Sequence, residues 1–330
     1  MNNVNDIVIS TRIRLARNLK DYPFPCRLNT EQQSEILSKV KTALQEESKL
    51  KLIELDRINE VEAVALVERH LCSPEFISKQ QNRGLFLSGD ETVSIMVNEE
   101  DHIRIQVIMS GLDFEKAYAE ADRIDNVLST TLNFAFDNKL GFLTQCPTNL
   151  GTGMRASIML HLPALTENRA IGRIAENLSK LGLTMRGLFG EGSEPRGAIF
   201  QLSNQVTLGI KEKEAIENLK NISMQLISQE LAARENMLNN LAVKDRIYRS
   251  VGILKTARLM TNQEGIALLS NVALGSGILQ NENVDLVNIY KIMTSIEPAM
   301  MMKRAGKKLA ATERDELRAT YLREQFANIQ

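Results

Sequence analysis

The segment VSIMVNEEDHIRIQVIM, residues 93–109, shows the strongest strand pattern in the chain. Apolar residues alternate with others on both sides of the acidic run NEED at 98–101, where the chain is expected to reverse. Period-two alternation is typical of strands that bury one face, so the segment predicts two neighbouring antiparallel strands. His102, Arg104 and Gln106 then share the face opposite the apolar residues. This polar face needs an explanation.

Other segments are expected to extend the same sheet. Residues 7–14 form a short β-prone run that ends in arginines. Residues 155–162 alternate between apolar and polar side chains after a glycine-rich loop. Residues 199–208 have the pattern of a β-hairpin that turns at 203–204.

Helical periodicity predicts the remaining elements. Thr30 and Gln33 fit a capping box at the start of one helix, and Asp113 fits the N-cap of a second. A third helix is expected over 166–181, and from Ala215 onward helix follows helix. Breaks in this last region are expected near four places: Gly252, Gly265, Gly275–Gly277 and Pro298.

These patterns predict two domains. Residues 1–235 form an α+β domain in which an antiparallel sheet is flanked by helices, and residues 236–330 form an all-helical C-terminal domain. A length of 330 residues with 43% hydrophobic and 25% charged residues is that of a globular protein with buried cores.

The charge balance limits the partners of the protein. There are 40 basic and 41 acidic residues, so the net charge of −1 provides no general attraction for nucleic acid or for an anionic membrane. Residues 1–7 lack the apolar core of a signal peptide, and no run of about 18 apolar residues occurs. We therefore expect a cytoplasmic protein.

The three cysteines do not indicate a metal site or a disulfide framework. Cys26, Cys72 and Cys146 are odd in number and none belongs to a CxxC pair. We expect no metal ion held by protein side chains.

Arginines occur at the ends of predicted strands and beside glycine-rich loops. The loops cover 147–153 and 187–197, and the first can offer backbone N–H groups to an anion. A guanidinium is always charged and binds phosphate oxygens through a planar fork. Taken singly, each arginine is more often a solvated surface charge. Five of them beside two such loops favour a phosphate site: Arg12, Arg14, Arg104, Arg155 and Arg186.

The familiar nucleotide-binding motifs are absent. The chain has no GxxxxGK[ST] sequence and no HRD or DFG set, which disfavours a P-loop enzyme or a kinase of the usual protein-kinase fold. Glu99, Glu100 and Glu191 could face the arginine-rich site and hold a cation opposite the phosphates. By sequence alone these acids are as often ordinary turn residues.

Four motifs in order carry a resemblance. They are Ser10–Arg14 (STRIR), Asn98–Arg104 (NEEDHIR), Cys146–Ser157 (CPTNLGTGMRAS) and Arg186–Glu191 (RGLFGE). With these motifs the chain resembles the phosphagen kinase family, that of creatine and arginine kinases, over about residues 6–210. The resemblance implies a glutamine-synthetase-like catalytic domain that uses ATP, with Mg²⁺ bound through the nucleotide.

The resemblance also implies roles for individual residues. Glu100 and Glu191 grip the guanidinium of the acceptor, with Glu100 as the base, and Cys146 lies beside it. His70 lies near the adenine. The ATP site is expected at Ser10, Thr11, Arg12, Ile13, Arg14, His70, Arg104, Arg155, Ala156, Ser157, Ile158, Met159, Arg186, Gly187, Leu188, Phe189 and Gly190.

Departures from creatine and arginine kinases point to one branch of the family. Only residues 1–9 precede the first arginine motif, so the helical domain that encloses a small guanidine in those enzymes is expected to be missing. The loop at 190–194 and the sequence RDELRA at 314–319 resemble those of the bacterial protein arginine kinases. Phe189 stands where creatine and arginine kinases usually have arginine. The resemblance implies an allosteric phosphoarginine pocket at Arg314, Asp315, Arg318 and Ala319.

We therefore expect an enzyme that phosphorylates arginine side chains of proteins. The resemblance implies a role in the stress response, in which substrates are marked for Clp protease or a repressor is altered. It also implies an activator of the McsA type and a homodimer formed through the C-terminal domain. Two alternatives remain: a kinase for a free guanidino compound, and a phosphoarginine-binding adaptor without catalysis.

Overall fold

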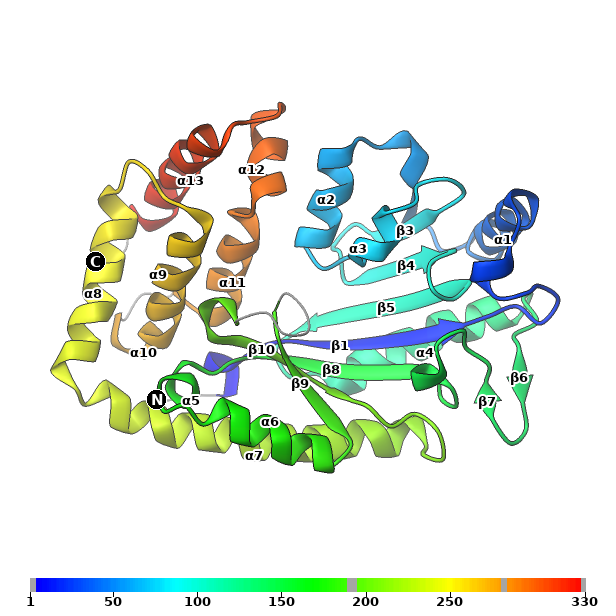
Figure 1. Ribbon diagram of the computed structural model, residues 1–330, viewed down its shortest axis with the longest axis horizontal. Helices are drawn as coiled ribbons and strands as arrows, with labels where there is room; N and C mark the ends of the chain where they lie inside the picture. Colours follow the sequence, from blue (N-terminus) through cyan, green and yellow to red (C-terminus); the bar gives the residue numbers. More distant parts are fainter. Residues whose placement is uncertain (1–3, 189–194, 280–283, 328–330) are drawn as a thin grey trace.

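The computed structural model describes residues 4–188, 195–279 and 284–327. An eight-stranded antiparallel sheet runs through it in the order β2-β3-β4-β5-β1-β8-β10-β9 (Figure 1). The strands of this sheet are β1 (Val8–Arg17), β2 (Leu50–Glu54), β3 (Gly84–Ser88), β4 (Val93–Val97), β5 (Ile103–Ser110), β8 (Met154–His161), β9 (Leu183–Gly187) and β10 (Ile199–Asn204). A separate short hairpin is formed by β6 (Phe136–Asp137) and β7 (Gly141–Phe142).

Helices precede, connect and follow the strands (Figure 1). Those interleaved with the strands are α1 (Thr30–Ala43), α2 (Glu60–Glu68), α3 (Pro74–Ile77), α4 (Phe114–Ser129), α5 (Pro163–Glu167) and α6 (Ile171–Lys180). Those after the last strand are α7 (Glu212–Leu238), α8 (Leu241–Thr256), α9 (Asn262–Leu274), α10 (Ser276–Leu279), α11 (Leu286–Ser295), α12 (Pro298–Ala305) and α13 (Ala311–Phe326). Within the described ranges, none is long and apolar enough to cross a membrane.

The predicted fold class is confirmed. Residues 93–109 form β4 and β5, which pair from Val93 opposite Val107 to Val97 opposite Ile103, with the acidic run at the reversal. The Asp113 cap is also confirmed, because its side chain accepts a hydrogen bond from the backbone N–H of Lys116 at the start of α4.

Two predicted helices differ in detail. The capping box of α1 is formed by Asn29 and Gln32, one residue before the predicted pair. The single helix expected over 166–181 is two helices, α5 and α6, because the chain turns at Arg169 with φ of 55°. A residue in the left-handed region cannot continue a right-handed helix.

The hairpin predicted over 199–208 is wrong. Residues 199–204 form one strand, β10, which lies between β8 and β9. Asn204 does not turn the chain; its side-chain oxygen accepts the backbone N–H of Ala156, and its amide donates to the carbonyl of Val206. The pairing partners come from distant sequence, which local turn propensity cannot report.

The helical region has one break where two were predicted, near Gly252 and near Gly265. Gly252 and Gly265 lie inside α8 and α9, and the chain breaks once between them, at 257–261. Gly275 ends α9 and Pro298 begins α12 as predicted. A Cβ atom on Gly265 would lie 2.9 Å from Ile296 Cδ1. This glycine therefore permits close packing and does not break the helix.

The buried apolar residues form two main cores. Alternate residues of the central strands, such as Ile13 of β1 and Ile158 of β8, are buried with residues of α4 and α7 in one apolar core. A second core is formed mainly by α8, α9, α11 and α13, which gather at one end of the sheet (Figure 1). The predicted domain boundary at residue 235 falls inside α7 and stays a prediction.

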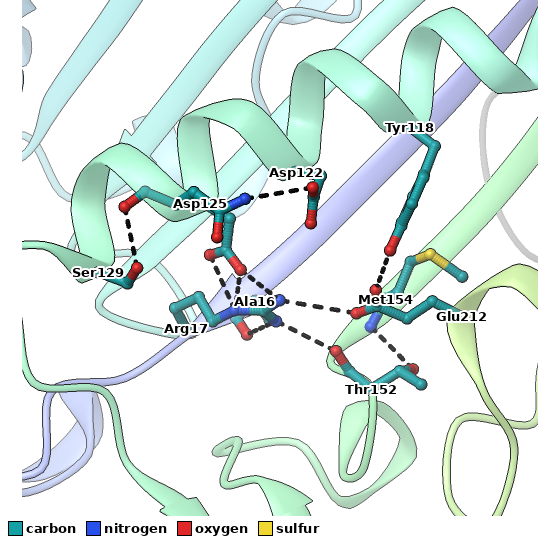
Figure 2. Close-up of polar contacts among 10 residues, drawn as sticks. Ala16, Arg17, Tyr118, Asp122, Asp125, Ser129, Thr152, Met154 and Glu212 are labelled. Carbon is teal, nitrogen blue, oxygen red and sulfur yellow. Dashed lines mark hydrogen bonds and ion pairs between the residues drawn. The ribbon is translucent and has the colours of Figure 1, made fainter.

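Arg17, at the end of β1, ties the sheet to its helical layer. Its side chain is buried, and its guanidinium bonds Asp125 of α4, with Nη2 2.8 Å from Oδ2 (Figure 2). Nη1 donates to the carbonyls of Ala16 and Thr152, and Glu212 at the start of α7 lies 3.8 Å from Nη2. Arg17, the next arginine of β1 after Arg12 and Arg14, is thus a structural cation.

A second buried ion pair joins α7 to the sheet. Glu230 accepts the backbone N–H groups of Ala164 and Leu165 at the start of α5, and Arg234 Nε donates to its Oε1 at 2.8 Å. Arg234 also donates to the carbonyl of His161 at the end of β8. Both side chains of the pair are almost fully buried.

Replacing Glu230 by alanine should therefore destabilise the protein strongly. The Glu230→Ala change leaves the Arg234 charge and two backbone donors buried without their acceptor, at a cost of about 3 to 5 kcal/mol of unfolding free energy. Asp245→Ala is the matched control, since Asp245 and Arg249 are also i,i+4 on a helix but are exposed and 3.9 Å apart. Its effect should stay within about 1 kcal/mol. Equal losses in urea unfolding would contradict the assigned role.

Candidate active site

The sheet register brings the predicted arginines together. Arg14 of β1 lies directly opposite Arg155 of β8, and Arg12 lies opposite Ser157 two residues earlier along the same strand. On the other side of β1, Arg104 of β5 lies opposite Ala16. Because side chains alternate along a strand, these arginines project from the face away from the apolar core.

The cluster is half-buried, and its like charges repel one another. Burial, followed by the charges of Arg12, Arg104 and Arg155, lowers the pKa of Arg14. Burial is also the main cause that lowers the pKa of Arg12 to about 10 and the pKa of Arg155. Within the described ranges, Arg14 Nε and Arg155 Nε are buried without a hydrogen-bond partner. Donors left in this state suit an anionic ligand, because phosphate oxygens would satisfy them.

Two glutamates hold Arg104 at the edge of the cluster. Glu99 and Glu100 each place a carboxylate oxygen 2.7 Å from a different nitrogen of this guanidinium. The Glu99 side chain is 4% exposed and also accepts a hydrogen bond from Ser73 Oγ at 2.6 Å. The Glu100 side chain is 39% exposed. Glu100 is therefore the one of these two acids that can meet an incoming cation.

Asp101 and His102 fix the acidic turn in place. Asp101 accepts hydrogen bonds from Asn18 Nδ2 at 2.7 Å and from the backbone N–H of Gln145 at 2.8 Å. The His102 ring accepts the backbone N–H of Leu19 at Nδ1 and donates from Nε2 to the carbonyl of Pro23. These bonds tie the turn to the end of β1 and to the loop before Cys146.

Cys146 and Glu100 line the same pocket. Its Sγ is 3.0 Å from Thr148 Oγ1 in the glycine-rich loop. Arg14, Arg104 and Arg155 supply the cationic part of the same pocket. The full lining comprises Arg14, Ala16, Glu100, Arg104, Cys146, Thr148, Asn149, Gly153 and Arg155.

A second pocket begins at Arg12. It contains Ser10 and His70, with Ser157 and Met159 of β8 on its floor. Burial lowers the pKa of His70 to about 4, so its imidazole is neutral at physiological pH. Gln106 Nε2 donates to the carbonyl of His70 and thereby holds this residue in its left-handed conformation, φ 60°. The predicted adenine-side histidine thus adjoins the predicted phosphate-binding arginines.

Other predicted ATP-site residues lie elsewhere. Thr11, Ile13, Ala156 and Ile158 are buried on the opposite, helix-covered face, so only their backbone can take part. Their place follows from strand alternation, which sends every second side chain away from the site.

The second loop is only partly described. Arg186 lies opposite Gln201 on β10, Gly187 lies opposite Phe200, and Leu188 packs against the C-terminal core. Phe189, Gly190 and Glu191 fall outside the described residues.

The predicted phosphoarginine residues lie on α13, apart from both pockets. Arg318 is almost fully buried and donates to the carbonyls of Ile296 and Met260 and to Asp315. Arg314 is partly exposed and donates to the carbonyl of Leu309. Ala319 is buried in the C-terminal core. Arg318 is therefore a structural cross-link between helices, whereas Arg314 can reach solvent.

Sequence reasoning missed several residues of the site. Gln201 accepts a hydrogen bond from Arg12, Asn18 holds Asp101, and Tyr290 of α11 lines the His70 pocket. Gln201 could have been found, because it lies on the polar side of an alternating strand. Tyr290 belongs to a helix whose position no local pattern gives.

Comparison with known proteins agrees with this geometry. Residues 31–233 match the ATP:guanido phosphotransferase C-terminal catalytic domain, and residues 240–330 match the protein-arginine kinase McsB C-terminal domain. The chain belongs to the ATP:guanido phosphotransferase family.

Relatives in this phosphotransferase family cover nearly the whole chain. A protein-arginine kinase of Brevibacillus brevis is 44% identical over 98% of this chain and 92% of its own length. One from Halothermothrix orenii is 45% identical over 96% of this chain and 92% of its own length. Among solved structures, a duplicated taurocyamine kinase of Schistosoma mansoni shares 30% identity with a TM-score of 0.63, over 70% of this chain and 34% of that one. A lombricine kinase at 24% identity and the same TM-score, over 70% of this chain and 68% of that one, supports the fold alone.

The anchoring role of His102 predicts a pH-dependent contribution to stability. Burial lowers the pKa of His102 to about 4, whereas an unfolded histidine titrates near 6.5. Between these values the unfolded chain binds the additional proton, so the stability that the neutral ring contributes is lost as pH falls. The unfolding free energy of the wild type relative to His102→Gln should drop by about 2 kcal/mol between pH 7 and pH 5. A difference that stays constant in urea titrations at both pH values would contradict the burial of a neutral ring.

Proposed function

We propose that this protein transfers the γ-phosphoryl group of ATP to arginine side chains of other proteins. The arginine cluster, with buried guanidinium nitrogens that lack partners within the described residues, is the observation that carries the proposal, because it fits a polyphosphate. The names of the relatives from Brevibacillus brevis and Halothermothrix orenii support arginine in proteins as the acceptor.

The two pockets would have different roles. Arg12, Arg14 and Arg155 would hold the phosphates, which directs the terminal phosphate toward the pocket that contains Glu100 and Cys146. When bound, Mg·ATP supplies the phosphoryl group together with a cation that offsets its charge. Phosphoryl transfer then depends mainly on alignment and charge stabilisation, which fixed guanidinium groups on a rigid sheet can provide.

The acceptor needs a base. A guanidinium is protonated at neutral pH, with a reference pKa above about 12, and a protonated nitrogen is not a nucleophile. Glu100 would orient the guanidinium and accept a proton from the attacking nitrogen as the N–P bond forms. The Arg104 guanidinium pairs with this carboxylate at 2.7 Å. Arg104 must therefore turn toward the phosphates before an acceptor arginine can pair with Glu100. Glu191 would hold the guanidinium together with Glu100. Cys146 would make a modest electrostatic contribution.

We extend the proposal to regulation through the C-terminal helices. Arg314, with Asp315 beside it, would bind the phosphate of a phosphoarginine, while Arg318 and Ala319 hold the helix that presents them. The coupling of such a site to catalysis is typically about 1 to 3 kcal/mol. The same proposal includes activation by an McsA-type protein and delivery of substrates to Clp protease. It also includes a cytoplasmic location and a homodimer through the C-terminal helices.

The central test follows transfer of label from ATP. Wild-type protein should place acid-labile, base-stable label from [γ-³²P]ATP on an unfolded protein and not on free arginine. Transfer only to free arginine would support a small-guanidine kinase, and transfer to neither would contradict the proposal.

Glu100→Gln keeps the shape of the side chain but removes the proton acceptor. Its phosphorylation rate should fall by roughly 100- to 10,000-fold, which is the usual contribution of a general base. ATP affinity, measured by calorimetry, should not fall, because loss of the Glu100 charge releases Arg104 toward the phosphates. A rate near that of the wild type would remove Glu100 from its assigned role.

Arg314→Ala tests the regulatory pocket without removing a buried residue. Binding of a phosphoarginine peptide should be lost, because one fork that addresses the phosphate is gone, while ATP affinity stays unchanged. Arg249→Ala, at an exposed arginine of α8, is the matched control. Equal phosphoarginine binding by Arg314→Ala and the wild type in calorimetry would show that the pocket lies elsewhere.

A further inference from the structure

The pocket that contains His70 is closed on one side by the C-terminal helices. Its sheet side is formed by residues of β1, β5, β8 and β10, and another wall by α11. This wall contributes Val287, Tyr290 and Lys291 to the lining of the pocket. These residues lie outside the segment 31–233 that matches the catalytic domain of the family.

Tyr290 carries a polar atom that the protein does not satisfy. Its Oη is buried, and within the described residues it has no hydrogen-bond partner. A buried hydroxyl without a partner is unfavourable, and the remedy is an acceptor that enters the pocket. Burial also raises the pKa of Tyr290, so the phenol keeps its proton at neutral pH and can donate it.

The surroundings of Tyr290 suit the nucleoside part of a nucleotide. Its ring lies at 12° to the imidazole of His70, with centroids 6.3 Å apart, and both rings line the pocket. Ile9, Ile108 and Met159 provide apolar lining. A flat heterocycle with a few polar atoms matches a pocket of ring faces and aliphatic side chains.

The position of the charges favours one direction of the ligand. Arg12 lines the same pocket, and Arg14 and Arg155 line the neighbouring one. Of the other two cations in the lining, Arg69 is paired with Glu91 and Lys291 is exposed. Phosphates would therefore lie from Arg12 toward Glu100, which leaves the Tyr290 end of the pocket for the base and sugar.

We propose that the hydroxyl of Tyr290 donates a hydrogen bond to the nucleoside part of the bound nucleotide. The nucleotide site is then completed by a residue of the C-terminal helical part, so the catalytic sheet by itself holds the phosphates but only part of the nucleoside. This contact rests on the ATP site of the proposed function and adds a recognition residue to it.

Calorimetry with Tyr290→Phe tests the contact. Phenylalanine keeps the ring and its packing but lacks the hydroxyl, so ADP should bind about 2- to 10-fold more weakly, the loss expected for one neutral hydrogen bond. Binding of inorganic tripolyphosphate, which has no base or sugar, should be unchanged. Tyr248→Phe is the matched control, since Tyr248 lies on α8 and is 50% exposed.

The outcomes separate the possible roles. Equal ADP affinity in Tyr290→Phe and the wild type would make Tyr290 a packing residue and overturn the proposal. An equal loss with ADP and tripolyphosphate would place the contact on the phosphates and overturn its assignment to the nucleoside. Because ADP binding needs no acceptor, a protein that binds ADP but phosphorylates no arginine would contradict the proposed function and leave this contact in place.

A measurement on the unchanged protein covers the case in which the variant does not fold. ADP should slow amide hydrogen exchange over 286–295, the residues of α11, and tripolyphosphate should not. Exchange in α11 that ADP leaves unaltered would contradict the contact.

Discussion

Arg14 and Arg155 face each other on adjacent strands, and the rest of the structure has to hold them there. Like charges directly opposite in a sheet are destabilising, and burial adds to the cost. The register of β1 against β8 keeps these two residues adjacent. That register is set on the reverse face, where Ile13 and Ala156 are buried in the apolar core. A shift by one residue would exchange the two faces and expose the core, so hydrophobic burial enforces the cationic cluster.

The acidic turn shows how the same constraint shapes the neighbouring residues. Glu99 and Glu100 are adjacent in sequence and both contact Arg104, yet only Glu99 is buried. The Glu99 carboxylate is also held by Ser73, whereas the Glu100 carboxylate is exposed and can exchange Arg104 for another cation. Residues that serve a ligand in this way keep the free protein less stable than it could be.

The helical part is joined to the sheet region beside the ligand pocket. Glu68, at the end of α2, accepts the backbone N–H groups of Ala299 and Met300 at the start of α12, each at 2.9 Å. A carboxylate at a helix N-terminus meets unpaired donors and the positive end of the helix dipole. His70 follows two residues after Glu68, and α11 directly precedes α12. The two walls of the pocket are thus connected by one carboxylate, which links the position of the C-terminal helices to the shape of the site.

The sequence by itself determined the strands of residues 93–109, the helix capped by Asp113 and the side of each strand on which its arginines lie. These features depend on local periodicity and on side-chain caps, which a short window of sequence contains. The family motifs added the expected roles of Glu100 and Cys146 beside the acceptor guanidinium. Tertiary structure alone decided that residues 199–204 form an inner strand, that Arg318 is buried as a cross-link, and that Tyr290 faces His70. Each of these depends on contacts between segments far apart in the chain, where the free energy of burial overrides local propensity and no local pattern records the partner.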